Sequence, residues 1–304
     1  MDYKHELEFG LFLNPDAYNP QEVLRVARLA DSLGLDFVAI QDHPYQHAHL
    51  ESVALLSTIA ATTKQITVQP HVISLPLRLP ALLAKEFATI DILSGGGRVA
   101  LGLGAGAFWQ AIQAFGGPMR APREAVQALE EAIAIIRGMW TPTLSVKVPG
   151  EFYAVRNVRP GPFPIAPIPI GIGAVGPKML SLIGRTADDW LVSGYADLNQ
   201  LAEGNQRIDD AALAAGRTPS AIRRTYGLNP NGLGKPAAPE SLTAQAWIDR
   251  GITLALDYGV SRFLVVPIDS SWDRTLNFIA EQAAPGIRDA VASARSNRAM
   301  PVTI

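Results

Sequence analysis

An aspartate and a histidine stand side by side where a short apolar run, residues 37–40, gives way to a polar segment. The pair is Asp42-His43, and Pro44 follows it. A carboxylate beside an imidazole can handle protons, because the carboxylate can orient the ring or raise its pKa. His43 is therefore a candidate acid–base group with Asp42 as its partner. The alternative is a helix-entry loop in which Asp42 is a cap and His43 is merely solvated.

A second candidate is the segment 71–80, which begins with His71, Val72 and Ile73. It follows a β-branched run and is too long and apolar for a simple turn. Such a segment either backs a flat ligand or packs as ordinary apolar loop. The sequence leaves both interpretations open.

The segment 102–106 is rich in glycine and ends in Gly104, Ala105 and Gly106. A dinucleotide fingerprint needs G-x-G-x-x-G opening straight into a helix, and this spacing does not fit. Glycines here either let the backbone approach a ligand or pack closely in a turn.

Another glycine-rich loop, made of Gly173, Ala174, Val175 and Gly176, precedes Pro177. Proline suits the first position of a helix. Backbone N–H groups at a helix N-terminus bind phosphate, so these residues are a candidate phosphate site. A plain tight connection is the alternative.

The positions of the histidines and the absence of cysteine exclude several kinds of chemistry. His47 and His49 have the spacing of a metal-ligand pair, but further ligands would have to come from later strands, and no histidine follows His71. We therefore predict no metal, and a solvated loop for His47 and His49. The absence of cysteine excludes a disulfide framework, an iron–sulfur cluster and a cysteine nucleophile.

Composition narrows the class of protein. The chain has 304 residues, 48% of them hydrophobic and 18% charged, with a net charge of −2. This composition excludes a disordered chain, and it offers no basic footprint for nucleic acid or an anionic membrane. No uncharged apolar run approaches about 18 residues, and the N-terminus lacks a signal pattern, so we expect a cytoplasmic protein with no membrane span.

The elements that must position these residues alternate between β-rich runs and amphipathic stretches. Eight strand-like runs are predicted, at residues 9–13, 37–40, 66–73, 99–103, 168–172, 189–193, 222–228 and 263–266. Eight strand–helix units favour a single α/β domain over residues 1–304, a (β/α)8 TIM barrel, over an open doubly wound sheet. The active site of such a barrel lies where its strands end.

Four other stretches carry smaller expectations. The clearest helix runs from Val126 to Trp140, and residues 108–122 before it read as irregular. An excursion at about 141–167 is expected to hold a small hairpin. Arg223 and Arg224 read as a surface basic pair, with an acidic ligand as the alternative. The loops expected to select substrate are 108–122 and 228–239.

Three stretches resemble the bacterial luciferase-like flavin and deazaflavin oxidoreductases, the luciferase-like monooxygenase superfamily. They are residues 39–45, 76–106 and 170–190. The likeness covers most of residues 7–195 and fades afterwards. The middle stretch, which includes Gly95, Gly96 and Gly97, is the most specific.

This resemblance implies a TIM barrel with a tricyclic cofactor, coenzyme F420 or FMN, in its mouth. In similar proteins strand three bulges at its end, often with a non-prolyl cis peptide, and backs the ring. That would place His71, Val72 and Ile73 behind the cofactor, with its phosphate on the loop 173–176. The glycines around strand four, 95–97 among them, would lie where the cofactor binds.

The resemblance also bears on the reaction. An Asp-His pair after strand two looks like the F420-dependent branch, although Pro44 stands where other members have an aromatic residue. F420-dependent hydride transfer to or from a small organic substrate is therefore favoured. The substrate would lie under Phe108 and Trp109, and His43, oriented by Asp42, would exchange the proton. An FMN monooxygenase fed by a separate reductase and a non-catalytic flavin-binding protein are the alternatives. Family members often dimerise through early barrel helices, which suggests a homodimer.

Overall fold

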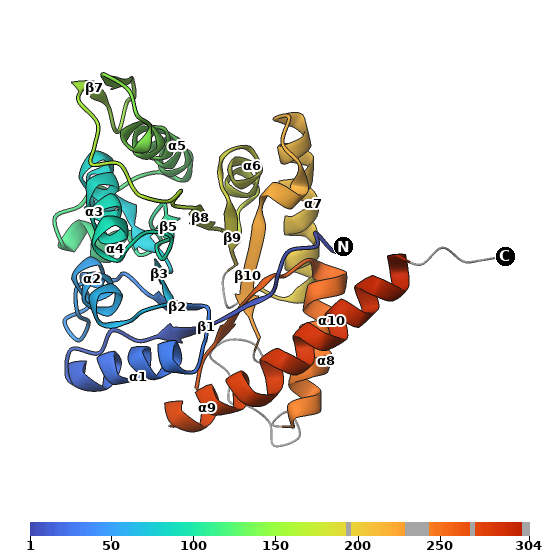
Figure 1. Ribbon diagram of the computed structural model, residues 1–304. Helices are drawn as coiled ribbons and strands as arrows, with labels where there is room; N and C mark the ends of the chain where they lie inside the picture. The colour runs from blue at the N-terminus through green and yellow to red at the C-terminus, as the bar shows by residue number, and fades with distance from the viewer. Residues whose placement is uncertain (193–195, 229–242, 268–270, 300–304) are drawn as a thin grey trace.

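A ring of parallel strands forms the centre of the computed structural model, with helices around it (Figure 1). The structure describes residues 1–192, 196–228, 243–267 and 271–299. The sheet order is β3-β2-β1-β11-β10-β9-β8-β5-β4. Its strands are β1 (Glu8–Leu13), β2 (Phe37–Ile40), β3 (Thr67–Pro70), β4 (Ile73–Ser74), β5 (Leu101–Gly104), β8 (Ile170–Gly173), β9 (Asp189–Leu191), β10 (Arg223–Gly227) and β11 (Arg262–Val265).

The ring has eight members because β3 and β4 are two pieces of one barrel strand, separated by His71 and Val72. Its ends meet where Val68 pairs with Val99 and where β4 pairs with β5. The predicted TIM barrel is thus confirmed, and each predicted strand overlaps an observed one. The predicted strand 189–193 ends at a residue outside the described part.

Helices follow the strands as a (β/α)8 fold requires. They are α1 (Pro20–Ser32), α2 (Ser52–Thr62), α3 (Pro80–Leu93), α4 (Trp109–Ala114), α5 (Pro122–Trp140), α6 (Pro177–Thr186), α7 (Leu198–Ala214), α8 (Ala244–Tyr258), α9 (Trp272–Phe278) and α10 (Ala284–Ala299). Short helical turns occupy Leu75–Leu77, Pro219–Ala221 and Ile279–Ala283. No helix in these described ranges is long and apolar enough to cross a membrane.

Proline explains where several of these helices begin. It is the first residue of α1, α3, α5 and α6. Its fixed φ suits the first helical position, where the missing N–H costs nothing. The stretch 108–122, expected to be irregular, contains the short helix α4.

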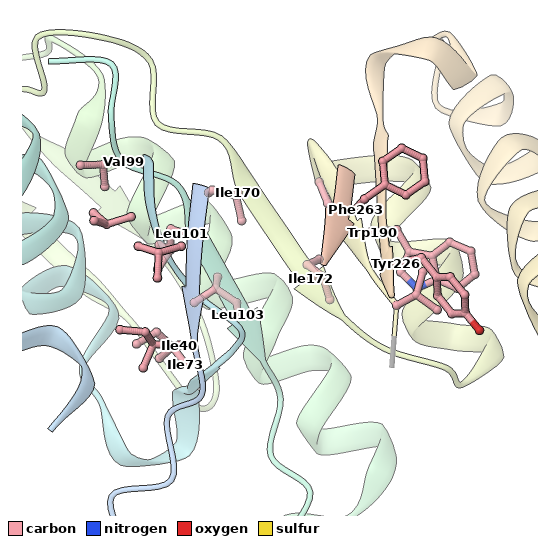
Figure 2. Close-up of a cluster of buried hydrophobic side chains, with 14 of the residues drawn as sticks. Ile40, Ile73, Val99, Leu101, Leu103, Ile170, Ile172, Trp190, Tyr226 and Phe263 are labelled. Atoms are coloured by element: carbon pink, nitrogen blue, oxygen red, sulfur yellow. The ribbon is translucent and has the colours of Figure 1, made fainter. Parts of the chain in front are cut away.

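The outer face of the barrel strands packs against the helices. Figure 2 shows Leu101, Leu103, Ile170 and Ile172 among the buried side chains of this layer. Alternate residues on the same strands face the barrel interior, as the period of two requires. Most of the hydrophobic core therefore lies between the strands and the helices rather than inside the barrel.

The N-terminal end of the barrel interior, which we call the floor, is built from charged and polar residues: Glu8, Gln69, Asp189, Thr225 and Arg262. The guanidinium of Arg262 pairs with Glu8 at 2.7 Å and Asp189 at 2.8 Å, and donates to Gln69 Oε1 at 2.6 Å. Thr225 donates to the same carboxylate oxygen of Asp189 at 2.8 Å. Because β11 is not a neighbour of β9 or β3 in the sheet, the bonds from Arg262 to Asp189 and Gln69 cross the barrel interior.

The excursion forms the predicted hairpin, made of β6 (Val146–Val148) and β7 (Val155–Val158) beside α5 (Figure 1). Two buried or partly buried carboxylates fasten its irregular parts. Glu131 accepts the backbone N–H groups of residues 151, 152 and 153, each at 2.9 Å. Asp91 accepts those of Ile165 at 2.7 Å and Ala166 at 3.1 Å.

Candidate active site

His43 follows β2, at the C-terminal end of the barrel, which we call the mouth. A turn begins at this residue, because the N–H of Gln46 donates to the His43 carbonyl at 2.9 Å. Proline favours the second position of such a turn, and Pro44 occupies it. The turn brings Tyr45 back to the imidazole, where its hydroxyl lies 2.7 Å from Nδ1. Within the described part of the chain, Nε2 of His43 makes no hydrogen bond and is not shielded from solvent.

Asp42 binds Ser52, Ser74 and Arg78 rather than the His43 ring that it was predicted to orient. It is 2% exposed, and its carboxylate accepts the Ser52 hydroxyl at 2.8 Å and the Ser74 N–H at 2.9 Å. Arg78 donates to it from two nitrogens, at 2.9 and 3.3 Å. No hydrogen bond joins Asp42 to His43. The prediction that this carboxylate orients the ring by contact is wrong, because neighbouring residues of an extended segment point to opposite sides.

The charge state of His43 follows from its surroundings. Burial lowers the pKa of its imidazole below the usual value of 6.5, and the nearby His49 lowers it further. The charge of Asp42 acts in the opposite direction but does not prevail. Burial, with a contribution from Asp42, raises the pKa of the Tyr45 phenol. Near neutral pH the pair is thus an uncharged imidazole and a protonated phenol.

His49 lies closer to the site than predicted. Its ring centroid is 6.3 Å from that of His43, and its Nδ1 is sealed from solvent without a hydrogen-bond partner. The expectation of a solvated loop therefore holds for His47, which is exposed, and fails for His49. Among the described residues no group of three or more carboxylates or imidazoles could hold a metal ion.

The end of strand three carries a non-prolyl cis peptide between His71 and Val72. Nδ1 of His71 is shielded from solvent and unpartnered, and burial lowers the pKa of this imidazole to about 4. Ile73, in contrast, is wholly buried in the outer core with Ile40 (Figure 2). The Ile73 side chain therefore packs in the core, and a part for this residue in cofactor binding stays a prediction.

Val72 explains two of the candidate glycines. A Cβ on Gly104 would lie 2.5 Å from a methyl of Val72, and one on Gly173 would lie 3.0 Å from another. The two glycines make room for the Val72 side chain. We call His71 and Val72 together the Val72 platform. Their bare backbone thus accommodates a protein side chain.

The remaining residues of the first glycine-rich loop are packed. Ala105 is buried, and Gly106 adopts a φ of +106°, which favours glycine. A Cβ there would collide with Trp109 and Pro76. Trp109 therefore packs down onto this loop. Phe108 is 59% exposed, and its ring meets His43 edge-on at 5.4 Å.

The loop from Gly173 to Gly176 leads into α6 as predicted, with Pro177 first and Gly176 as N-cap. The carbonyl of Ala174 accepts a hydrogen bond from the indole N–H of Trp190 at 2.9 Å, and this bond ties the loop to β9. Val175 is 57% exposed, and a Cβ on Gly176 would meet nothing within 4 Å. The loop therefore has open space beside Val175 and Gly176.

The glycine run 95–97 and the basic residue Arg224 both lie away from the mouth. Gly95, Gly96 and Gly97 precede the barrel strand, at the opposite end from the mouth, and Asp91 accepts the N–H of Gly97 at 2.8 Å. Arg224, expected on the surface, is fully buried and bonds Asn205 at 2.9 Å. Neither feature belongs to the candidate site.

Sequence reasoning missed Tyr45 and Arg78. The proline after His43 is a turn signal, and it could have placed the following tyrosine beside the histidine. No local signal joins Arg78 to Asp42, because 36 residues separate them.

The residues present suit a flat cofactor that bears a phosphate. The Val72 platform offers an apolar side chain and one orphaned imidazole nitrogen at the end of strand three. The loop before α6 offers the backbone N–H groups of a helix N-terminus. His43 lies at the mouth in an uncharged state that can take a proton.

Known proteins resemble this chain over most of its length. The family model for the luciferase-like monooxygenase matches residues 7–248. An F420-dependent glucose-6-phosphate dehydrogenase of Amycolatopsis mediterranei is 28% identical over 72% of this chain and 67% of its own length. One from Gordonia bronchialis is 31% identical over 64% and 60% respectively. One from Kineococcus radiotolerans is 30% identical over 79% and 75%.

Solved structures share the fold. An F420-dependent secondary alcohol dehydrogenase with an F420-acetone adduct aligns with a TM-score of 0.79 at 20% identity, over 94% of this chain and 100% of that one. The oxygenating constituent of a Pseudomonas putida diketocamphane monooxygenase, in complex with FMN, aligns with a TM-score of 0.71 at 18% identity, over 92% and 99%. The relatives and structural neighbours are oxidoreductases and monooxygenases. With a family model that matches most of its residues, the chain belongs to the luciferase-like monooxygenase family.

Proposed function

We propose that the chain is an F420-dependent oxidoreductase that transfers a hydride to or from a small organic substrate while His43 exchanges the accompanying proton. The observation that carries this is an uncharged imidazole at the barrel mouth whose Nε2 is open to solvent. The relatives of known activity are F420-dependent dehydrogenases, which supports this cofactor over FMN.

The cofactor would be held by two parts of the mouth. The Val72 platform would back its ring, and the N–H groups of the loop 173–176 would bind its phosphate. When bound, F420 supplies a hydride acceptor or donor. The chain's own contribution is orientation, exclusion of water and proton transfer at His43 Nε2.

The substrate would enter beside Phe108. This exposed ring stands edge-on to His43 and 6.3 Å from Tyr45. An aromatic wall next to the acid–base group suits an alcohol or carbonyl compound with an apolar face. Trp109 would support the wall from behind. The second expected selectivity loop, 228–239, lies almost wholly outside the described residues.

An FMN monooxygenase, served by a separate reductase, is the second candidate, and the likeness to the FMN-bound diketocamphane monooxygenase favours it. The two chemistries differ in cofactor and in their need for O2. A non-catalytic flavin carrier would bind a cofactor without using His43.

A cofactor titration of the purified protein tests the proposal. Binding of F420 would perturb its absorbance near about 420 nm, and binding of FMN would perturb a band near about 450 nm, because these bands belong to the cofactors' rings. Tight binding of FMN and none of F420 would overturn the F420 assignment. Binding of neither would overturn the redox assignment altogether.

His43→Gln tests the acid–base role. We expect turnover to fall about 100-fold or more, the range for loss of a general acid or base, while the F420 dissociation constant stays within about twofold. His47→Gln, on the same loop but exposed, is the control. Normal turnover of His43→Gln would show that another group moves the proton or that the protein is a carrier.

We also propose a homodimer formed through α2 and α3. A mainly apolar groove between these helices exposes Leu82 and Leu93. Apolar patches of this kind mark interaction sites. Sedimentation of the wild type and of Leu93→Lys would test it, with a monomer expected only for the variant.

A further inference from the structure

We propose that Tyr45 is the positioning residue of the candidate acid–base site. Its phenol oxygen holds His43 Nδ1, so that Nε2 is the atom that exchanges a proton with the substrate. This inference rests on the proposed oxidoreductase function. It replaces the carboxylate partner suggested by the sequence with a neutral one.

The first step is that Asp42 has no capacity left for His43. A carboxylate has about four acceptor positions. Ser52, the Ser74 N–H and two nitrogens of Arg78 fill them. Arg78 also pairs with Glu51 at 2.6 Å, which ties the start of α2 to the same cluster. Asp42 thus joins the end of β2 to the start of the segment after β4.

The second step is that the backbone delivers Tyr45 to the ring. The Gln46-to-His43 hydrogen bond closes a turn across Pro44 and Tyr45. This turn requires two residues between donor and acceptor, and the proline presets its first dihedral. The turn that Pro44 favours thus places the Tyr45 hydroxyl 2.7 Å from Nδ1.

The third step is that two further rings pack against the pair of His43 and Tyr45. Phe108 contacts His43 and Tyr45 edge-on, with interplanar angles of 82° and 61°. His49 lies on the histidine at 6.3 Å between centroids. The titratable groups that face His43 are Tyr45, His49 and Asp42. Rotation of the imidazole would break its hydrogen bond with Tyr45.

The chemistry follows from a hydroxyl partner. With Nδ1–H donating to Tyr45 Oη, the lone pair of Nε2 is free. In alcohol oxidation the substrate O–H bond breaks and an Nε2–H bond forms, while the hydride from the adjoining carbon leaves to the bound cofactor. The imidazolium keeps the same bond to Tyr45. Reduction of a carbonyl reverses each of these changes.

Tyr45→Phe removes the hydroxyl and keeps the ring. In cofactor-free protein, long-range ¹H–¹⁵N NMR reads the tautomer of each histidine, and His43→Gln assigns the His43 signals. We expect the wild type to carry its His43 proton on Nδ1, and Tyr45→Phe to lose that preference and to show a lower His43 pKa. Turnover with F420 should fall about tenfold, the upper effect of one neutral hydrogen bond, with cofactor affinity unchanged.

Tyr258→Phe, at the C-terminal end of α8 and away from the mouth, is the matched control and should change neither readout. An unchanged His43 tautomer and pKa in Tyr45→Phe would overturn the proposal. A changed tautomer with wild-type turnover would overturn it too, because positioning would then not matter to the reaction. Failure of the wild type to bind F420 refutes the proposed function, and the NMR comparison is independent of that result.

Discussion

The two ends of the barrel interior solve the problem of burying polar groups in opposite ways. In the floor, Arg262 is surrounded by Glu8, Gln69 and Asp189, and its guanidinium also lies 4.1 Å from the centroid of the Phe37 ring. In the mouth, burial lowers the pKa values of the His43 and His71 imidazoles, and the Nδ1 atoms of His49 and His71 have no hydrogen-bond partner in the part of the chain that the structure describes.

The difference separates stability from function. Paired charges cost little as long as every partner stays, so the floor is a rigid closure of the barrel. Buried polar atoms without a partner among the described residues occur at both ends, Asp189 Oδ1 in the floor and the Nδ1 atoms of His49 and His71 in the mouth. The ends differ in that the floor is held by ion pairs, whereas the mouth presents imidazoles that are not ion-paired with any described residue.

Breaking the floor should have the largest effect. Arg262→Met leaves Asp189 buried without its cation, while Glu8 keeps its ion pair with Arg223, and we expect the free energy of unfolding to fall by about 3–5 kcal/mol. Urea denaturation followed by circular dichroism measures it. Arg25→Met, which removes a surface pair with Glu22 and Asp273, should cost no more than about 1 kcal/mol. Equal losses in the two variants would mean that pairing does not hold the floor.

Acid should act on the mouth through His71. The unfolded chain takes up this proton near pH 6.5 and the folded protein only near about 4, so stability is lost as pH falls between these values. The loss should approach about 3 kcal/mol at the lower end. Unfolding measured across this range should show a shallower pH dependence in His71→Gln than in the wild type. His47→Gln, on the surface, should keep the wild-type slope, and a wild-type slope in His71→Gln would contradict the assignment.

Crowding the Val72 platform should have a smaller effect. The added methyl of Gly104→Ala would lie 2.5 Å from Val72, so we expect a loss of about 1–3 kcal/mol and weaker cofactor binding. Gly176→Ala introduces a methyl into open space and should leave stability within about 0.5 kcal/mol. Similar results for both glycines would show that Val72 shifts freely.

The fold was predictable because its signals are local. Alternating runs and helical periodicity gave the strands, and proline marked where helices such as α6 begin. The resemblance supplied the cis peptide before Val72, which no propensity indicates. The short helix α4 was missed, because its six residues carry too little periodicity to stand out.

The candidate site was predictable only in its location. Because Asp42 and His43 are adjacent in sequence, Asp42 was expected to orient His43. In the structure a turn brings Tyr45 to His43, and a segment 36 residues away brings Arg78 to Asp42. Arg224 illustrates the same limit, since it looks like its neighbour Arg223 but is buried against α7, where it pairs with Asp209 at 2.5 Å. Which of two adjacent residues faces inward depends on contacts that are remote in sequence.

The carboxylates that fasten the excursion have a consequence for its motions. Backbone N–H groups at positions 151–153, outside any regular element, are bonded to Glu131, and Tyr153 also donates its hydroxyl to the carbonyl of Leu75 beside the platform. Amide hydrogens held in this way exchange with solvent only when the segment opens. In deuterated water this irregular stretch should therefore retain its protons as a strand would, and their release would report when the segment around Tyr153 detaches from Glu131.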